Sequence, residues 1–187
     1  MNHIGTKDIE TEYLLLRKWN INDAGDIFEY CGDSTIVPKP HKNIEQTKNE
    51  LKKWIKSYKK VDTYEWGIEL KNIKKIIGVI FVVEKNDFNK SCTIAYTLSK
   101  NYWNNGYATE ALKNVLKFLL IDVGYNRVEG GHFNDNPASG RVMEKAGMKY
   151  EGTLRQSNIN WKTGEFIDSK LFGIIKEDIN ETKINNN

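Results

Sequence analysis

One turn, at residues 102–109, constrains this chain more than any other feature of its sequence. An apolar, alternating run at 93–98 leads into it, and the amphipathic stripe of a helix leads out of it. A Gly-containing turn at such a junction directs several unpaired backbone N–H groups toward one point, where the aligned peptide dipoles add partial positive charge. The turn therefore predicts a site for a phosphate or diphosphate group.

The best-known phosphate-binding motifs are missing from this turn. It has neither the Gly-Lys-Ser/Thr of a P-loop nor the three glycines of a dinucleotide fingerprint. Taken alone, Gly106 fits an ordinary strand-to-helix connection better than a ligand site. Other parts of the sequence must therefore decide whether this turn is a phosphate site or an ordinary connection.

Hydrophobic periodicity predicts an α/β (α+β) fold in which a mixed, mostly antiparallel sheet of seven strands carries helices on both faces. The strands are expected at 13–19, 64–70, 76–83, 91–98, 127–133, 149–155 and 166–175. Helices are expected at 23–30, 44–60, 109–123 and 137–145. The first two helices form a pair between the first two strands, where they would cover a substrate.

Length and charge limit the class of protein. A chain of 187 residues with 39% hydrophobic content fits one domain with its own core, here expected over 1–187 with residues 1–8 and 180–187 frayed. The net charge of +3 is mild, and both signs are interspersed along the chain. This pattern argues against a nucleic-acid partner, which usually meets basic residues gathered on one face.

Cysteine usage and hydropathy suggest a cytoplasmic protein. Cys31 and Cys92 have no metal-ligand spacing and form no disulfide framework, so we expect two reduced thiols and no metal. The sequence shows no signal-peptide core and no run of 18 apolar residues, so neither secretion nor a membrane partner is expected. A homodimer is left open.

A second motif opens the helix expected at 137–145. Asn136 precedes Pro137, and proline is favoured at the first helical position. By itself Asn136 would be a helix cap, and Ser139 a solvent-facing hydroxyl in the first turn. Gly147 closes the helix.

Together the two motifs resemble the GNAT superfamily of CoA-dependent N-acyltransferases. That superfamily has a turn of the form Arg/Gln-x-x-Gly-x-Gly/Ala, followed about thirty residues later by Asn-x-x-Ala/Ser and a Gly-Phe-like helix end. Four strings look like its ribosomal-protein-alanine N-acetyltransferase branch: Tyr-Trp-x-x-Gly-Tyr-Ala-Thr-Glu-Ala at 102–111, Asn-x-x-Ser at 136–139, Glu-Lys-Ala-Gly-Met at 144–148 and Glu-Gly-Thr-Leu-Arg at 151–155. The resemblance runs from Leu-Leu-Leu-Arg at 14–17 to the last strand.

The resemblance implies acetyl-CoA as co-substrate and a cleft where the strand at 93–98 splays from the strand at 127–133. The pantetheine arm would pair with the strand backbone, the diphosphate would rest on turn amides, and Asn136 would bond the pantetheine end. The cofactor-binding residues implied in this way are Tyr96, Thr97, Leu98, Asn104, Asn105, Gly106, Tyr107, Ala108, Thr109, Asn136 and Ser139.

The chain differs from the family pattern at three positions, and one of these differences bears on the choice of catalytic group. Trp103 stands at the motif's Arg/Gln position and Asn104 at a usual Gly. Met143 replaces the Tyr that serves many members as general acid. Ser139 is therefore the candidate to assist the departing sulfur, as its counterpart is proposed to do in this branch, and a strand amide at 96–98 is the implied oxyanion donor.

The general base is left open. Some branch members use a Glu shortly after the Leu-Arg-Gln string, but Asn158 occupies that position here. The alternatives are a water chain or another titratable side chain, each of which is more often structural. These side chains are Glu65, Glu69, Glu110, Glu129 and His132.

Three functions stay open from the sequence. The first is transfer of an acetyl group to a protein N-terminal α-amine, which rests on resemblance alone. The second is the same chemistry on a small amine, such as a polyamine or an aminoglycoside-like molecule. The third is a catalytically silent CoA-binding module, suggested by Met143 and Asn158.

Overall fold

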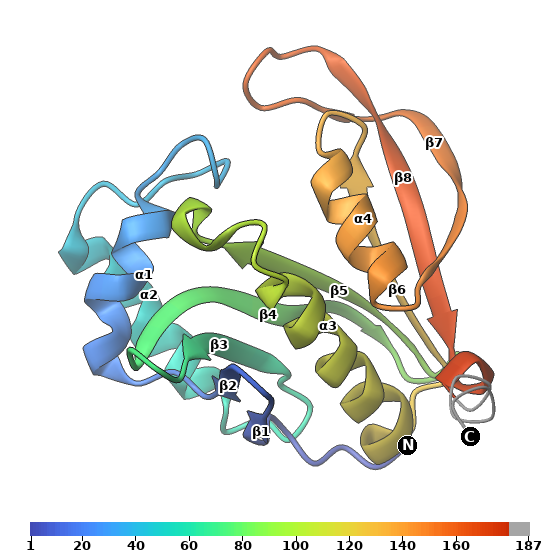
Figure 1. Cartoon of the computed structure of the whole chain (residues 1–187), viewed down its shortest axis with the longest axis horizontal. Coiled ribbons are helices and arrows are strands. Elements are labelled where there is room, and N and C mark those ends of the chain that lie inside the picture. The colour runs from blue at the N-terminus through green and yellow to red at the C-terminus, as the bar shows by residue number, and fades with distance from the viewer. Residues whose placement is uncertain (180–187) are drawn as a thin grey trace. The chain divides into compact units, whose positions relative to one another are not determined.

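The structure is a computed structural model, and it describes residues 1–179; the expectation for residues 180–187 lies outside the described part. Figure 1 traces the elements along the chain. The strands are β1 (Ile9–Glu10), β2 (Leu14–Arg17), β3 (Glu65–Leu70), β4 (Lys75–Asn86), β5 (Ser91–Leu98), β6 (Arg127–Phe133), β7 (Lys149–Ile159) and β8 (Phe166–Ile175). The helices are α1 (Ala24–Cys31), α2 (Ile44–Ser57), α3 (Tyr107–Lys117) and α4 (Pro137–Lys145), with the short helical turns η1 (Ile21–Asp23), η2 (Lys100–Tyr102) and η3 (Phe118–Val123).

The eight strands found within residues 1–179 form one sheet in the order β1-β2-β3-β4-β5-β6-β8-β7. Strands β5 and β6 run parallel, whereas β2 with β3 and β6 with β8 are examples of the antiparallel pairs. This confirms the mixed, mostly antiparallel sheet. The predicted count of seven strands was wrong because β1 was missed. With two residues, β1 is too short for an alternating pattern to reveal it.

The chain divides into two compact units. The N-terminal unit comprises His3–Phe81 and Tyr96–Ala111, and the C-terminal unit comprises Met1–Asn2, Val82–Ala95 and the chain from Leu112 on. The amino-terminal residues, expected to fray, make hydrogen bonds inside their own units. The Asn2 N–H donates to the Val123 carbonyl at 2.9 Å, and the His3 ring lies 2.9 Å from the Tyr64 hydroxyl.

In the N-terminal unit, α1 and α2 pack their apolar faces on the sheet. The shared cluster consists of Trp19, Ala24, Ile27, Tyr30, Leu51 and Ile76, all nearly or fully buried. A side-chain carbon added at Gly67 of β3 would lie 2.5 Å from the Trp19 ring, so that ring covers one face of β3. The neighbouring residues Trp66 and Ile68 point to the other face and are also buried. Both faces of β3 are therefore covered.

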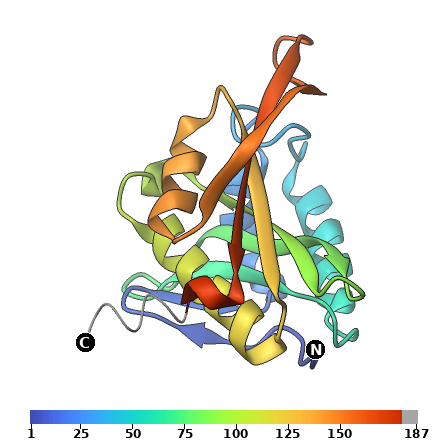
Figure 2. The ribbon, with the colours of Figure 1, turned by 90° about the vertical axis from the view of Figure 1, so that its right-hand side faces the viewer.

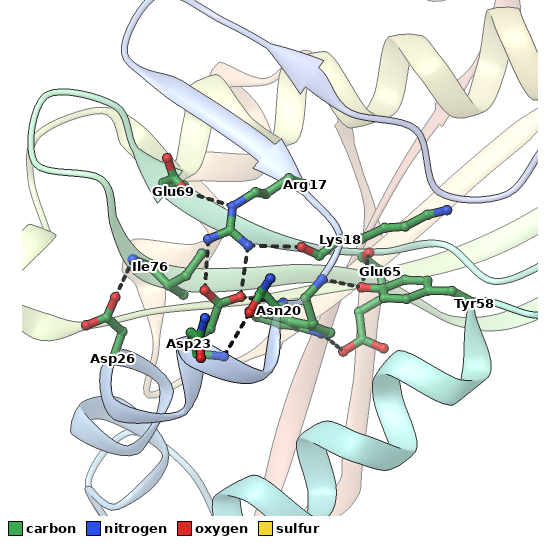
Figure 3. A network of polar contacts seen from close by, with 11 residues as sticks. Arg17, Lys18, Asn20, Asp23, Asp26, Tyr58, Glu65, Glu69 and Ile76 are labelled. Atoms are coloured by element: carbon green, nitrogen blue, oxygen red, sulfur yellow. Dashed lines mark hydrogen bonds and ion pairs between the residues drawn. The ribbon is translucent and has the colours of Figure 1, made fainter.

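A charged network fixes the end of β2 in this unit (Figure 3). The guanidinium of Arg17 donates to both carboxylate oxygens of Asp23 at 2.8 Å, and its Nε donates to Glu69 at 2.6 Å. Asp23 also accepts the Asn20 N–H at 2.7 Å, closing a capping box at η1. One cation thus holds β2, β3 and the start of α1 together.

In the C-terminal unit, β6, β8 and β7 carry α4. Figures 1 and 2 both show β7 running beside β8, and their register is antiparallel. Met143 of α4 is buried, and the end of its side chain packs against Gly130 of β6. The helix expected at 109–123 begins at Tyr107 and finishes in the wider turn η3, where left-handed Gly124 ends it.

We predict that Arg17→Met will destabilise the protein by roughly 2–4 kcal/mol, because it keeps the aliphatic stem but leaves the carboxylates of Asp23 and Glu69 unpaired in a largely buried setting. The measurement is the urea midpoint of unfolding at constant m-value. Lys75→Met is the control, since it removes the more exposed pair with Glu29 and should cost less than about 1 kcal/mol. Equal losses in the two variants would contradict the role assigned to Arg17.

Candidate active site

The turn before α3 has the backbone of an anion site. Asn104 and Gly106 both lie in the left-handed region, at φ +61° and +83°. Asparagine is one of the few side-chain-bearing residues that enter this region readily, so Asn104 can serve where the family usually has Gly. The turn is exposed, and within residues 1–179 the six amides of 104–109 donate no hydrogen bond.

Two side-chain contacts hold this turn in place. The Trp103 indole N–H donates to the Leu98 carbonyl at 2.8 Å, which ties the turn to the end of β5. The Asn105 amide group donates to the Trp103 carbonyl at 2.8 Å. The structure therefore brings Leu98 and the predicted residues of the turn together, as expected from their sequence spacing. Trp103 itself was expected only as a motif position and serves as the anchor.

The first turn of α3 is anchored by Glu110. Its carboxylate accepts from the Thr11 hydroxyl at 2.5 Å and from the Tyr13 N–H at 2.8 Å. A carboxylate at this position also interacts favourably with the positive end of the helix dipole. These contacts give Glu110 a structural role, which is the role expected for it more often than that of a general base.

Strand β5 carries the predicted residues Tyr96, Thr97 and Leu98 at its carboxyl end. The register of β5 with β6 is recorded for Ser91 to Thr93 opposite Arg127 to Glu129. No later pair between these strands is found in the described part of the chain, although β5 continues to Leu98. The recorded pairing of β5 with β6 therefore covers only the first residues of β5.

Asn136 and Ser139 form a separate group in the C-terminal unit. The Asn136 side-chain oxygen accepts the Ser139 N–H at 3.4 Å, and the Asn136 amide group donates to the Ser139 hydroxyl at 3.2 Å. Asn136 is thus the cap of α4, as its position before proline suggested. The cap also fixes the Ser139 hydroxyl in the first turn, where it is half-buried.

His132 is packed as a structural residue. It is 9% exposed, its Nδ1 lies 2.7 Å from the Phe133 carbonyl, and its ring contacts that of Phe172. A side-chain carbon added at Gly140 would lie only 2.5 Å from the other ring nitrogen, so α4 covers that side as well. These contacts favour the structural reading over a role as general base.

The carboxylates considered as bases also have partners. Glu69 is bound by Arg17, and Glu129 is paired with Arg127 at 3.1 Å. Glu65 accepts the Trp19 indole N–H at 2.7 Å and lies beside Tyr58, whose hydroxyl donates to the Glu65 carbonyl at 3.0 Å (Figure 3). Each is therefore accounted for by structure.

Asn158 lies in a polar group between β7 and β8. Its amide donates to the Ser169 hydroxyl at 2.8 Å, and the Ser157 hydroxyl donates to the same oxygen at 3.0 Å. A neutral amide cannot act as a base, so this position serves hydrogen bonding alone. Asp168 lies next to this group, and we did not identify it from sequence because nothing in the pattern predicts the irregular register that places it there.

Cys31 and Cys92 are both free cysteines. Burial raises the pKa of the Cys31 thiol to about 11 and that of Cys92 to about 12, so neither is a thiolate near neutral pH. Residues 1–179 contain no group of three His, Cys, Asp or Glu side chains placed to hold a metal ion. No helix within this range is long and apolar enough to cross a membrane.

Comparison with known proteins identifies the family. The profile of the Acetyltransf_3 family, described as an acetyltransferase (GNAT) domain, matches residues 13–149, and the chain therefore belongs to the GNAT acetyltransferases. The uncharacterized N-acetyltransferase YoaA of Bacillus subtilis (strain 168) is 29% identical over 173 residues, covering 90% of this chain and 96% of YoaA. The resemblance found in the sequence is confirmed.

Two solved structures share the fold. The ribosomal-protein-S5-alanine acetyltransferase from Vibrio fischeri superposes with a TM-score of 0.79 at 20% identity, covering 92% of this chain and 98% of that one. The microcin C7 self-immunity acetyltransferase MccE, solved in complex with acetyl-CoA and AMP, gives a TM-score of 0.76 at 20% identity, covering 88% and 93%. Both of these structures are named as acetyltransferases, and one of them holds acetyl-CoA.

We predict opposite pH dependences for two glutamate variants. Burial raises the pKa of the Glu65 carboxyl, so its contribution to stability is present below the unfolded-state pKa and is lost as the pH rises through the folded-state value. Glu65→Gln, which keeps an acceptor for Trp19, should therefore gain in free energy of unfolding relative to the parent between pH 4 and pH 7.

The control is Glu45→Gln. Hydrogen bonding to Lys48 lowers the pKa of the Glu45 carboxyl, so this carboxylate stabilises the folded chain above the unfolded-state pKa and the effect disappears as the pH falls. Glu45→Gln should lose stability relative to the parent over the same rise in pH. The free energy of unfolding of each variant and of the parent is measured by urea titration at several pH values. If the difference from the parent changes with pH in the same direction for both variants, the raised pKa of Glu65 is refuted.

Proposed function

We propose that this GNAT acetyltransferase transfers the acetyl group of acetyl-CoA to a primary amine, in the first instance the α-amine of a protein N-terminus. The observation that carries the proposal is the row of free amides at 104–109, shaped by left-handed Asn104 and Gly106 at the start of α3. A diphosphate is the anion that such a row at a helix start suits best. The name of the Vibrio fischeri structure supports the choice of acceptor only through the shared fold.

The residues present fit CoA along two stretches of the N-terminal unit. The turn amides would hold the diphosphate by charge-assisted hydrogen bonds. The backbone of Tyr96, Thr97 and Leu98 would pair with the amide groups of the pantetheine arm, except that the Leu98 carbonyl already accepts from Trp103. When bound, acetyl-CoA supplies an acetyl thioester that is activated toward amines.

Ser139 and Asn136 would serve the departing sulfur and the pantetheine end. The Ser139 hydroxyl has a fixed neighbour in the Asn136 amide, which donates to its oxygen at 3.2 Å. The hydroxyl would donate a hydrogen bond to the departing sulfur as the thioester opens, while the proton lost by the acceptor amine balances the thiolate. Met143 cannot take this part, because its side chain has no proton to give and is buried in the core.

We predict that Gly106→Asp will weaken CoA binding by at least tenfold, measured by calorimetry. The aspartate would bring negative charge to the diphosphate and force a side chain into left-handed backbone. Gly164→Asp is the matched control, because Gly164 is also left-handed, at φ +75°, with open space around it, but lies in the turn between β7 and β8. Unchanged affinity in Gly106→Asp, or an equal loss in both variants, would refute the diphosphate site.

We predict that Ser139→Ala will lower kcat by about 10- to 100-fold with little change in the KM for acetyl-CoA, since a thiolate leaves tolerably without full protonation. Asn136→Ala is the comparison, because it removes the cap of α4 and should reduce stability by about 0.5–2 kcal/mol. Full turnover by Ser139→Ala would remove this residue from the mechanism.

The acceptor class is tested by release of free thiol from acetyl-CoA in the presence of amines, with mass spectrometry of the product. A peptide with a free N-terminus should be acetylated on its α-amine. Acetylation of spermidine or an aminoglycoside in its place would move the function to a small amine. Binding of acetyl-CoA without release in any mixture would make the chain a silent CoA-binding module.

A further inference from the structure

The pairing of β7 with β8 contains a bulge between Leu154 and Asn158. Leu154 pairs with Ser169, and the next recorded pair is Asn158 with Ile167, so the three residues at 155–157 stand opposite Asp168 alone. The central one, Gln156, lies in the left-handed region at φ +50°, which is uncommon for a residue with a side chain. Such an irregularity is often retained where it redirects side chains toward a site.

A cavity of about 630 Å³ lies at this bulge in the C-terminal unit. It is lined by Thr153, Leu154, Arg155, Gln156 and Asp168. It is open to solvent, since four of its five lining residues are exposed and Asp168 is half-buried. These residues carry one guanidinium, one carboxylate, one amide, one hydroxyl and a single aliphatic side chain. The cavity is thus suited to a polar ligand.

Neither charge of the cavity is neutralised within the described part of the chain. Arg17 and Arg127 each pair with two carboxylates, whereas Arg155 has no ion pair among residues 1–179. Asp168 uses one carboxylate oxygen to accept the Gln156 N–H at 2.8 Å, and its other oxygen accepts no hydrogen bond in the same range. The Arg155 guanidinium and one carboxylate oxygen of Asp168, both carried by lining residues of this pocket, therefore remain available to a ligand.

The cavity is connected to the loop that leads into α4. The Asn134 N–H donates to the Asp168 carbonyl at 3.1 Å, and the Asn160 side chain donates to Asp135 at 3.0 Å. These bonds link β8 and the turn between β7 and β8 to the residues just before Asn136. A molecule held in the cavity would be held against the loop that positions Asn136 and Ser139.

We propose that this cavity is an acceptor subsite and that it selects amines carrying an anionic group close by, such as peptides with an acidic residue next to a free N-terminus. The inference rests on the proposed function. Arg155 would bind the carboxylate in a forked geometry, and the open oxygen of Asp168 would accept a peptide N–H. A polyamine has no anionic group for Arg155 to bind. Its positive charges would be attracted by Asp168 but repelled by Arg155, so the cavity gives it little net stabilisation.

The test compares a tetrapeptide amide that has aspartate at its second position with the same peptide that has asparagine there, and with spermidine. Binding to the protein saturated with CoA is measured by calorimetry, and acetylation is measured separately. The parent protein should bind the aspartate peptide about tenfold more tightly than the asparagine peptide, which corresponds to about 1.4 kcal/mol. Arg155→Gln should abolish this difference and leave the affinity for CoA unchanged.

Lys176→Gln is the control, because it removes the same charge from an exposed position outside the cavity and should preserve the preference. A preference that survives in Arg155→Gln, one that is lost equally in Lys176→Gln, or tighter binding of spermidine would overturn the subsite. Selective peptide binding without acetylation would overturn the proposed function but leave the subsite intact. Acetylation that does not depend on Arg155 would overturn the subsite but leave the proposed function intact. If the peptide neither binds nor is acetylated, the subsite and the proposed function are both overturned.

Discussion

The left-handed backbone at Asn104 and Gly106 is the constraint on which the candidate active site depends. Two such residues, two positions apart, turn the chain sharply from β5 into α3 and leave six successive amides without partners inside the described chain. Elsewhere in a folded protein this would be costly, because backbone N–H groups are nearly always paired when they are removed from water. Here they are exposed, so water can satisfy them until an anion takes its place.

The rest of the N-terminal unit keeps this turn rigid. Trp103 fastens the turn to the end of β5, and Glu110 fastens the first turn of α3 to the start of β2. The Arg17 network then holds β2 to β3 and to α1, so the contacts of the turn continue into the core (Figure 3). A site fixed in advance loses less conformational entropy when a ligand binds, which favours affinity for a flexible molecule such as CoA.

Much of this arrangement could be predicted from the sequence because it is local. The turn, the cap at Asn136 and the apolar stripe of α3 depend on residues a few positions apart, whose chemistry predicts their backbone. What could not be predicted depends on pairing between distant residues. Strand β1 has too few residues for a pattern, and the bulge at Gln156 becomes visible only when β7 is aligned with β8. The partner of Glu65, the Trp19 indole, likewise comes from a distant part of the chain.

Arg155 differs from Arg17 and Arg127 in having no carboxylate partner within residues 1–179. Arg17 and Arg127 are neutralised by carboxylates within their own units, and each stabilises the strands that it joins. Arg155 is carried on a bulged segment with left-handed backbone, a conformation that costs free energy and contributes no ion pair to the fold. Arg155 lines the same pocket as Asp168, one of whose carboxylate oxygens accepts no hydrogen bond within residues 1–179. The proposed acceptor subsite gives this costly segment a function, because an anionic group on the acceptor would supply the ion pair that the fold does not give Arg155.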